Sequence, residues 1–369
     1  MKTPLRALCL TLYPVEAASA RYRVVQYLPH LRAAGIEPIF RPFMSPPFFR
    51  RFYTPGNKLR KTLGLLGFAL RRCGDIARAG GCDVVFVQKG AHFGPPLVER
   101  MIAQILRKPL VFDFDDAMHV VSNSLTYGRL AMPFKYPRKT PQILKLSRSV
   151  VVGNRHLEEY SLTLNPHVTL IPTVVDTTLV RPRERQSKTS DKLVLGWIGT
   201  HSTYPYLESL IPVIQEVAAR HDVLLRVVGA RREVAIPGVE VDNRKWSLKT
   251  ELADLQSFDI GLYPIVEDQW SLGKSGFKAV QYMAVGIPAV CSPVGATHDI
   301  VTQGVDGFLP ANHEAWVTQI SQLVGDAALR EQIGAAGRAK VEGWYCLHRQ
   351  APRLAEVLRQ AADSQAQQA

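Results

Sequence analysis

The residues best suited to chemistry lie in the stretch GKSGFKAVQYMAVGIP, residues 273–288. Its pattern predicts a glycine-rich turn, then an amphipathic helix, then a second turn before the next apolar run. The backbone N–H groups at a helix N-terminus attract anions, and Lys274 and Lys278 flank this helix start. We therefore expect an anion site formed by the two lysines and by the backbone around Gly276 and Phe277.

A second group of polar residues is the run VFDFDDAMH, residues 111–119, which follows an apolar strand pattern. Alternation along a strand places Asp113 and Asp115 on the same side. Several carboxylates at one strand end are costly unless they serve a site. We expect Asp115 and Asp116 to hold a substrate hydroxyl or act as a base, with His119 close enough to join them. A Mg²⁺ ligand set and a solvated turn are the alternatives.

Two further strand ends carry candidate ligand-binding groups. One predicted strand is followed by small and hydroxylated residues, namely Gly199, Thr200 and Ser202. Another is followed by Glu267 and Asp268, beside an amide and a tryptophan that suit sugar recognition. The alternatives are a plain tight turn and an ordinary polar loop. Neither strand end carries GxGxxG, so a nicotinamide-binding fingerprint is not supported.

Arg21 and Arg23, in the motif SARYR, lie at the head of a predicted helix. Cations oppose the helix dipole there, whereas anions are favoured at that end. We expect the two arginines to bind an anionic ligand group. Simple solvation at the surface is the alternative.

The elements that position these residues alternate between apolar strands and amphipathic helices, which predicts an α/β fold with parallel sheets covered on both faces. A chain of 369 residues favours two domains. We expect Rossmann-like, doubly wound domains at residues 1–175 and 193–343, a polar linker at 176–192, and a C-terminal helix in 344–369 that crosses back to the first domain. Ligands of such sheets bind beyond the carboxyl ends of the strands, which favours a cleft between the domains.

The net charge of +13 favours anionic partners. No acidic residue occurs between Glu37 and Asp75, where basic and aromatic residues interleave. That composition suits a segment on an anionic membrane surface, and a solvated basic loop is the alternative. The residues that we expect at the membrane are Arg50, Arg51, Phe52, Arg60 and Lys61. Nucleic-acid binding is not expected, because no helix-turn-helix, zinc-finger or RNP pattern is present.

Other features of the sequence indicate in which cellular compartment the protein works. No apolar run reaches the length of about 18 residues that a membrane-spanning helix needs. The apolar start of the chain is interpreted as a first strand rather than a signal peptide. Five scattered cysteines without CxxC spacing predict reduced thiols and no structural zinc. We expect a cytoplasmic protein, peripheral on the inner face of a membrane.

The sequences DIGLYP, GKSGFKAVQYMAVGIPAVCSPVGATHDIV and GVDGFLP resemble the donor-binding half of the retaining glycosyltransferases of family 4, the glycosyl transferases group 1. The resemblance covers roughly residues 193–341 well and the first half more loosely. It implies a GT-B fold with two Rossmann-like domains and an interdomain cleft. It also implies transfer of a sugar from a UDP- or GDP-sugar with retention, without an obligatory cofactor or metal. The basic and aromatic segment favours a cell-envelope or lipid-linked saccharide as the acceptor.

The chain departs from the family pattern at several positions. Family members carry two spaced glutamates, which align here with Gly273 and Gln281. Gln281 retains hydrogen-bonding groups for a ribose, whereas a carboxylate could come only from neighbouring Glu267 or Asp268. The family's cations after the first strand of this domain are not evident, so Lys274 and Lys278 are expected to hold the diphosphate. The family's N-domain histidine is replaced by the Asp115–Asp116 pair.

Two other functions remain open at this point. A nucleotide-sugar epimerase of the same fold would interconvert sugars without an acceptor. A non-catalytic protein that binds membranes or nucleic acid would show salt-sensitive binding and no stabilisation by nucleotides.

Overall fold

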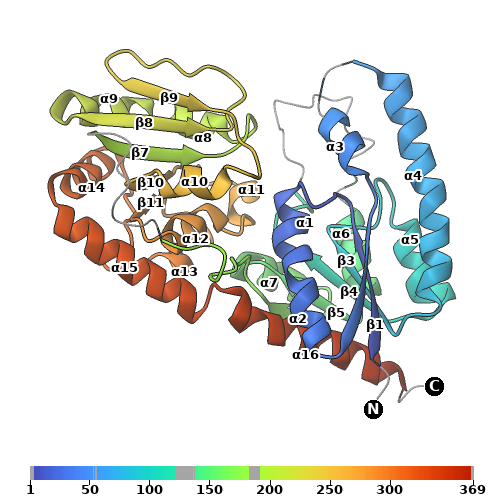
Figure 1. Ribbon diagram of the computed structural model, residues 1–369. Coiled ribbons are helices and arrows are strands. Elements are labelled where there is room, and N and C mark those ends of the chain that lie inside the picture. Colours follow the sequence, from blue (N-terminus) through green and yellow to red (C-terminus); the bar gives the residue numbers. More distant parts are fainter. Residues whose placement is uncertain are drawn as a thin grey trace. The chain divides into compact units, whose positions relative to one another are not determined.

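The computed structural model describes residues 4–52, 54, 56–120, 136, 138–182 and 192–366. The chain forms two compact units, each an α/β domain with a parallel sheet (Figure 1). Unit 1 comprises Met1–Val174 together with Leu347–Ala369, and unit 2 comprises Val175–Cys346. The segment expected as a linker, 176–192, falls within unit 2, and its residues 183–191 lie outside the described residues.

The sheet of unit 1 has six parallel strands in the order β2-β1-β3-β4-β5-β6. The strands are β1 (Leu5–Thr11), β2 (Ile36–Pro42), β3 (Val84–Gln88), β4 (Leu110–Phe114), β5 (Ser149–Val152) and β6 (Val168–Leu170). The direction of the crossovers reverses between β1 and β3. In doubly wound sheets ligands bind beyond the carboxyl ends of the strands at such a switch point.

The helices of unit 1 include two irregular turns, the 3₁₀ turn η1 and the π-helical turn η2. They are α1 (Ala18–Arg23), η1 (Val25–Tyr27), α2 (Leu28–Ala33), α3 (Pro46–Phe52), α4 (Lys58–Ala79), α5 (Leu97–Arg100), η2 (Met101–Ile105), α6 (Lys139–Leu146), α7 (Arg155–Leu162) and α16 (Leu347–Ala366). Alternating strand residues such as Leu10, Val87 and Phe112 form one buried cluster with Ile76 of α4 and Ile143 of α6. The last helix, α16, packs against α2, β3 and β4.

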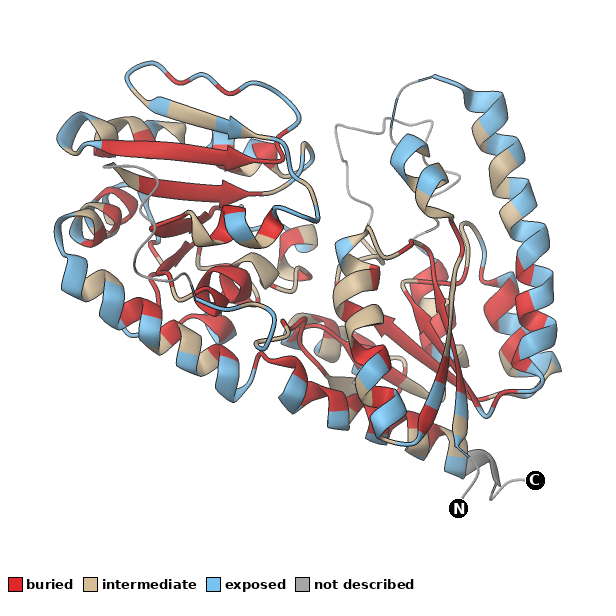
Figure 2. Ribbon diagram, viewed as in Figure 1, coloured by how far each residue is buried: buried red, intermediate tan, exposed pale blue. Residues whose placement is uncertain are grey.

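The sheet of unit 2 has five parallel strands in the order β11-β10-β7-β8-β9. They are β7 (Leu193–Ile198), β8 (Val223–Val228), β9 (Glu240–Arg244), β10 (Ile260–Tyr263) and β11 (Ala289–Cys291). The switch point lies between β7 and β10, because the crossovers run in opposite directions on either side of it. Figure 2 shows that the inner strands are buried, whereas the edge strand β9 is largely half-buried or exposed.

The helices of unit 2 cover both faces of this sheet. They are α8 (Tyr204–Glu208), α9 (Ile211–Arg220), α10 (Glu251–Gln256), α11 (Gln269–Leu272), α12 (Phe277–Ala284), α13 (Thr297–Ile300), α14 (His313–Gly325) and α15 (Ala327–Gly343). Residues of α8, α9 and α14 pack with Trp197, Leu225 and Leu262 in one buried cluster. Helix α12 packs against β10, β11 and α15.

The predicted α/β fold with two doubly wound domains is confirmed. In unit 2 residues 204–220 form two helices, α8 and α9, and Pro212 lies in the first turn of the second. In unit 1 helix α4 runs from Lys58 to Ala79. Among the described residues no helix is both long and apolar enough to cross a membrane.

Candidate functional site

The switch point of unit 2 is built around Tyr282 of α12. Strands β7 and β10 share a short register, Ile260 opposite Leu195 and Gly261 opposite Gly196. Beyond it the Tyr282 hydroxyl donates to the Leu262 carbonyl (3.1 Å) and accepts from the Ile198 amide (3.3 Å). Gly261 is required there, because a Cβ would lie 2.3 Å from the tyrosine ring. The ring and hydroxyl thus fix α12 against both strands.

The N-terminus of α12 lies at the carboxyl edge of this sheet, since the helix connects the end of β10 to the start of β11. Gly276 is its N-cap and has a left-handed backbone (φ 64°). A Cβ at Gly276 would lie 2.3 Å from Cδ1 of Ile300, so both space and backbone favour glycine. The first-turn amides of α12, starting at Phe277, therefore lie at the edge where ligands of such sheets bind.

The two lysines near this helix start lie over aromatic rings. Lys274 Nζ is 5.6 Å from the ring centroid of Tyr206 and 5.7 Å from that of Trp270. Lys278 Nζ is 5.4 Å from the ring centroid of Tyr263, the last residue of β10. Contacts of this kind hold an ammonium group over the face of an aromatic ring. The rings thus help to fix where the two lysines place their ammonium groups at the edge of the sheet.

Two arginines that the sequence reasoning did not select extend this positive edge. Arg231 and Arg232 follow β8, and the Arg232 guanidinium lies 4.6 Å from the ring centroid of Tyr204. Burial and then the charges of the two arginines lower the pKa of His201, so that residue lies near both. The sequence signal was present as two arginines directly after the glycine and alanine that end a strand.

The hydroxyl side chains that follow β7 contact one another in a local cluster. The Thr200 amide donates to Oγ1 of Thr203 (3.0 Å), and the Thr200 hydroxyl lies 2.8 Å from that of Ser202. Gly199 permits this turn, because a Cβ would lie 2.3 Å from the Trp197 ring. Thr200 and Ser202 are exposed at the carboxyl end of β7, where their role in binding a donor stays a prediction.

Of the expected sugar-binding acids, one has a structural role. Asp268 is the N-cap of α11, and its carboxylate accepts from the Ser271 amide at 2.6 Å. Glu267 is exposed at the same edge. Gln281 is buried in α12, with 7% of its surface exposed. Donor contacts of these three residues stay predictions.

In unit 1 the carboxylates after β4 are paired with a lysine. Lys89, directly after β3, lies 2.9 Å from Asp115 and also contacts Asp116. Burial alone would lower the pKa of Lys89, but the two carboxylates raise it above its ordinary value. Thr173 donates to Asp115 (3.1 Å), and the pKa of Asp115 is lowered because Lys89 outweighs its burial. Asp115 is therefore held ionised, which makes it a weak base at neutral pH.

The arginines of the first helix lie elsewhere than expected. Arg21 and Arg23 are in the last turn of α1 rather than at its head, where positive charge agrees with the helix dipole. Arg23 is buried, pairs with Asp113, and donates to the Ile171 carbonyl at 2.6 Å. Although burial alone would lower it, Asp113 raises the pKa of Arg23. The expectation that Arg23 lies at a helix head facing a ligand is thus corrected to a buried ion pair.

Two other expectations on unit 1 meet different surroundings. The ring of His119 stacks on that of Tyr160, with centroids 3.7 Å apart and planes 10° apart. Burial, and then His156, lower the pKa of His119. Within the described part of the chain no three His, Cys, Asp or Glu side chains are grouped so as to hold a metal ion.

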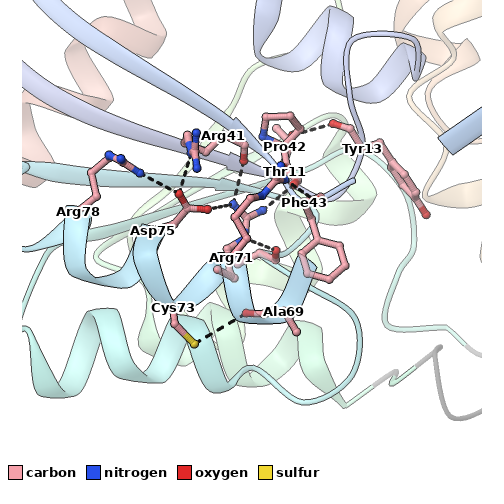
Figure 3. A network of polar contacts seen from close by, with 12 residues as sticks. Thr11, Tyr13, Arg41, Pro42, Phe43, Ala69, Arg71, Cys73, Asp75 and Arg78 are labelled. Atoms are coloured by element: carbon pink, nitrogen blue, oxygen red, sulfur yellow. Dashed lines mark hydrogen bonds and ion pairs between the residues drawn. The ribbon is translucent and has the colours of Figure 1, made fainter. Parts of the chain in front are cut away.

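Part of the basic segment turns out to be interior. Arg72 is fully buried and donates to the backbone carbonyls of Thr11, Arg41 and Ala91, each at 2.9 Å. Asp75, also buried, binds the side chains of Arg41, Arg72 and Arg78, as Figure 3 shows in part. These residues join β1, β2 and α4 rather than facing a partner.

The residues expected at a membrane are divided in the same way. Arg50, Arg51 and Arg60 are exposed, and Arg50 lies 3.8 Å from Glu16. Lys61 donates to the Thr54 carbonyl. Phe52 stacks on Phe93 with ring centroids 5.9 Å apart, within a cluster of aromatic side chains that pack on one another. The other members of that cluster are Tyr13, Phe43, Phe48, Phe49 and Phe68.

Residues 192–326 match the model of a family described as glycosyl transferases group 1. The matched region begins just before β7 and contains all four cations of the edge described above. Unit 2 therefore carries a glycosyltransferase domain, as the sequence predicted. No curated protein sequence shows a significant match to this chain.

Solved structures show the same fold over almost the entire chain. Sucrose-phosphate synthase from Thermosynechococcus elongatus has a TM-score of 0.70 at 17% identity, with 98% of this chain and 100% of that chain covered. A glycosyltransferase from Rickettsia africae gives 0.66 at 12% identity, covering 98% and 99%. HepE from Anabaena, in complex with UDP and glucose, gives 0.63 at 14% identity, covering 96% and 100%. The two Rossmann-like domains thus have the GT-B architecture.

Proposed function

We propose that this glycosyltransferase moves a sugar from a UDP- or GDP-sugar to a saccharide acceptor of the cell envelope. The acceptor is lipid-linked, and the anomeric configuration is retained. No metal is required, because the side chains and amides of unit 2 supply the positive charge. The protein works in the cytoplasm, against the inner face of the membrane.

The observation that carries the proposal is the cluster of cations at the carboxyl edge of unit 2. Lys274 and Lys278 flank the first turn of α12, whereas Arg231 and Arg232 follow β8 at the same edge of the sheet. Lys274, Lys278 and Arg232 lie over aromatic rings. A diphosphate is the dianionic group that such an edge suits best. HepE, which has the same fold, binds UDP, and this supports a nucleoside diphosphate as the anion here.

In the proposed reaction the bond between the anomeric carbon and the diphosphate breaks. Negative charge then develops on the leaving diphosphate, and Lys274, Lys278 and the amides near Gly276 and Phe277 stabilise it electrostatically. Gln281 lies one turn further along α12 and supplies the hydrogen bonds to the ribose. Glu267, exposed beside the edge, is the carboxylate available for the donor sugar, since Asp268 caps α11.

Unit 1 is proposed to hold the acceptor through its own carboxyl edge. Asp116 has 32% of its side chain exposed and is held by Lys89. It is therefore the better placed of the two adjacent aspartates to orient an acceptor hydroxyl. Asp115, buried and paired, acts through Lys89 by fixing the position of that lysine.

A thermal-shift panel tests the donor. We expect UDP or GDP to raise the melting temperature, with ADP and inorganic phosphate as controls, because a ligand that binds the folded state stabilises it. The same nucleotide should remain stabilising in the presence of EDTA. If no nucleoside diphosphate raises the melting temperature, the proposed donor site is wrong. Product analysis with a saccharide acceptor then distinguishes transfer from epimerisation of the free nucleotide-sugar.

A further inference from the structure

Helix α4 of unit 1 carries an outward stripe of four leucines. Leu59, Leu63, Leu66 and Leu70 follow one another at intervals of four, three and four residues, which places them on one face of the helix. Their exposed fractions are 75%, 58%, 57% and 75%. Single exposed leucines are ordinary in proteins, but a continuous stripe marks an interaction surface.

The opposite face of α4 already forms the contacts that hold the helix on unit 1. Arg72, Asp75, Ile76 and Ala79 are buried there, and Ile76 and Ala79 belong to the core cluster. Figure 2 shows that buried residues occur in the C-terminal part of α4, whereas the preceding turns are exposed or half-buried. The leucine stripe therefore lies outside the buried core cluster of unit 1 and is mostly exposed.

The charges around the stripe all have one sign. Lys58 and Arg60 are exposed beside its first leucine. Arg71 and Arg78 follow on the same flank as Arg60 and are also exposed, although Arg71 donates to the Pro42 and Phe43 carbonyls and Arg78 pairs with Asp75. Asp75 is the acidic residue of α4, and it is buried among arginines, with 1% of its side chain exposed (Figure 3). The outward face thus combines leucines with positive charge alone.

The neighbouring turns repeat this pattern. Helix α5 and the turn η2 pack against α4 and expose Leu97, Met101 and Ile105 at 58%, 41% and 70%. The acidic residue in these turns, Glu99, is fully buried and lies 3.2 Å from Lys139. Two adjacent elements therefore bury their acids and expose apolar side chains.

Two partners could cover the leucine stripe, a second copy of the chain or a membrane, and the positive charge beside the stripe favours the membrane. The spacing of the leucines also suits a helix pair between two copies of the chain. Self-pairing would be stabilised by opposite charges beside the seam, whereas here the flanks are uniformly basic and would repel. An anionic bilayer complements both features, because leucines enter the boundary between headgroups and acyl chains while arginines and lysines approach phosphates.

We propose that the outward face of α4 docks unit 1 on an anionic membrane surface through Leu59, Leu63, Leu66 and Leu70. This deepens the proposed function, on which it rests for the reason to reach a lipid-linked acceptor. It also changes the expected contact residues. Phe52 packs inside an aromatic cluster, and the leucines of α4 take the apolar role instead.

Vesicle flotation with the full-length protein tests the proposal. We expect binding to vesicles of phosphatidylcholine with phosphatidylglycerol and little binding to phosphatidylcholine alone. The variant Leu63→Asp/Leu66→Asp should bind at least about tenfold more weakly, because two apolar contacts are lost and two negative charges are added. Lys58→Gln/Arg60→Gln should lose roughly fivefold for each charge, the equivalent of about 1 kcal/mol per residue.

Leu162→Asp is the matched control, since Leu162 is an exposed leucine (51%) at the end of α7, away from α4. It should bind vesicles as the unchanged protein does. Undiminished binding by the Leu63→Asp/Leu66→Asp variant would overturn the proposal. So would sedimentation that shows a dimer in the unchanged protein and a monomer in this variant, which would assign the stripe to a second copy.

Nucleotide-induced thermal stabilisation, measured on the same variants, separates the two hypotheses. If the leucine variants keep that stabilisation and keep vesicle binding, only the membrane surface is wrong. If the unchanged protein binds vesicles but no nucleoside diphosphate, only the proposed donor is wrong.

Discussion

Cations at the carboxyl edges of the two sheets differ in the contacts that hold several of them. In unit 1 cations and carboxylates are paired inside the domain, as Lys89 is with Asp115 and Arg72 is with Asp75. In unit 2 the corresponding edge places Lys278 over Tyr263 and Arg232 over Tyr204. A carboxylate neutralises the charge of the cation that it pairs with, whereas an aromatic ring has no formal charge. The cations at the edge of unit 2 are those that we propose to bind an anion.

The two kinds of contact should also differ in whether their loss affects the stability of the fold or the binding of a ligand. Removing one partner of a buried ion pair lowers the stability of the fold, because the other charge remains buried without a partner. A cation over an aromatic ring can be removed with little effect on the fold, but the anion it attracts is lost. Substitutions at the two edges should accordingly affect different measurements.

The largest effect on stability is expected for Asp75→Ala in unit 1. Arg72 would remain buried without its carboxylate, at a cost of about 3–5 kcal/mol in the free energy of unfolding. Urea denaturation measures this loss. Asp222→Ala is the control in unit 2, because Asp222 pairs with Lys192 at the surface and its loss should cost at most about 1 kcal/mol. Equal losses for both variants would remove the contrast between the two units.

The pH dependence of stability should show the same contrast. Burial, with Lys139 adding to it, lowers the pKa of His92 in unit 1 to about 4, below its ordinary value near 6.5. As the pH falls, the unfolded state therefore protonates His92 before the folded state does. The contribution of His92 to the free energy of unfolding is complete above about pH 6.5 and is lost as the pH falls towards 4. The difference in unfolding free energy is up to about 3 kcal/mol.

Comparing the unchanged protein with His92→Gln by denaturation at pH 7 and pH 4.5 checks this. The variant should lose less stability on acidification. His201→Gln in unit 2 is the control, since His201 is less buried than His92. Burial is still the first cause that lowers the pKa of His201, and the charges of Arg231 and Arg232 lower it further. Parallel pH profiles for the unchanged protein and His92→Gln would contradict the assignment.

At the edge of unit 2 we expect Lys278→Ala to lower turnover by about a hundredfold, because one source of positive charge at the leaving diphosphate is lost. The urea midpoint should stay unchanged. Arg220→Ala removes an exposed cation at the end of α9 and should leave turnover unaltered. A Lys278→Ala enzyme with full activity would show that this lysine does not face the diphosphate.

The smallest effect is expected for Asp268→Ala. Loss of the N-cap of α11 should cost about 1 kcal/mol in the free energy of unfolding. Nucleotide affinity, measured by thermal shift or calorimetry, should change little if Asp268 only caps. A large loss of affinity with intact stability would instead return Asp268 to the donor site.

Much of the fold could be predicted from the periodicity of apolar residues and from the glycines and prolines that mark turns. The apolar strands and the glycine turns of unit 2 were recognisable because each pattern is local. Helix α12 starts directly after Gly276 as expected, since only glycine fits there. The edge strand β9 gave no such signal, because its sequence EVDNR is polar and only half-buried.

The site was harder to predict, because pairing across the fold is invisible in a linear pattern. Asp115 and Lys89 look like two separate polar residues until β3 and β4 lie side by side. The arginines of α4 look uniformly exposed until Asp75 is seen to bind three of the segment's arginines. Local patterns identified the residues that could do chemistry, and tertiary contacts decided which of them lie in buried ion pairs.

Helix α16 has a consequence for the synthesis of the protein. It buries Leu354, Leu358 and Ala361 within unit 1, although unit 2 precedes it in the chain. The ribosome therefore completes unit 2 before it makes α16. Unit 1 is begun before unit 2 and finished after it, so its core is closed only once α16 has been synthesised.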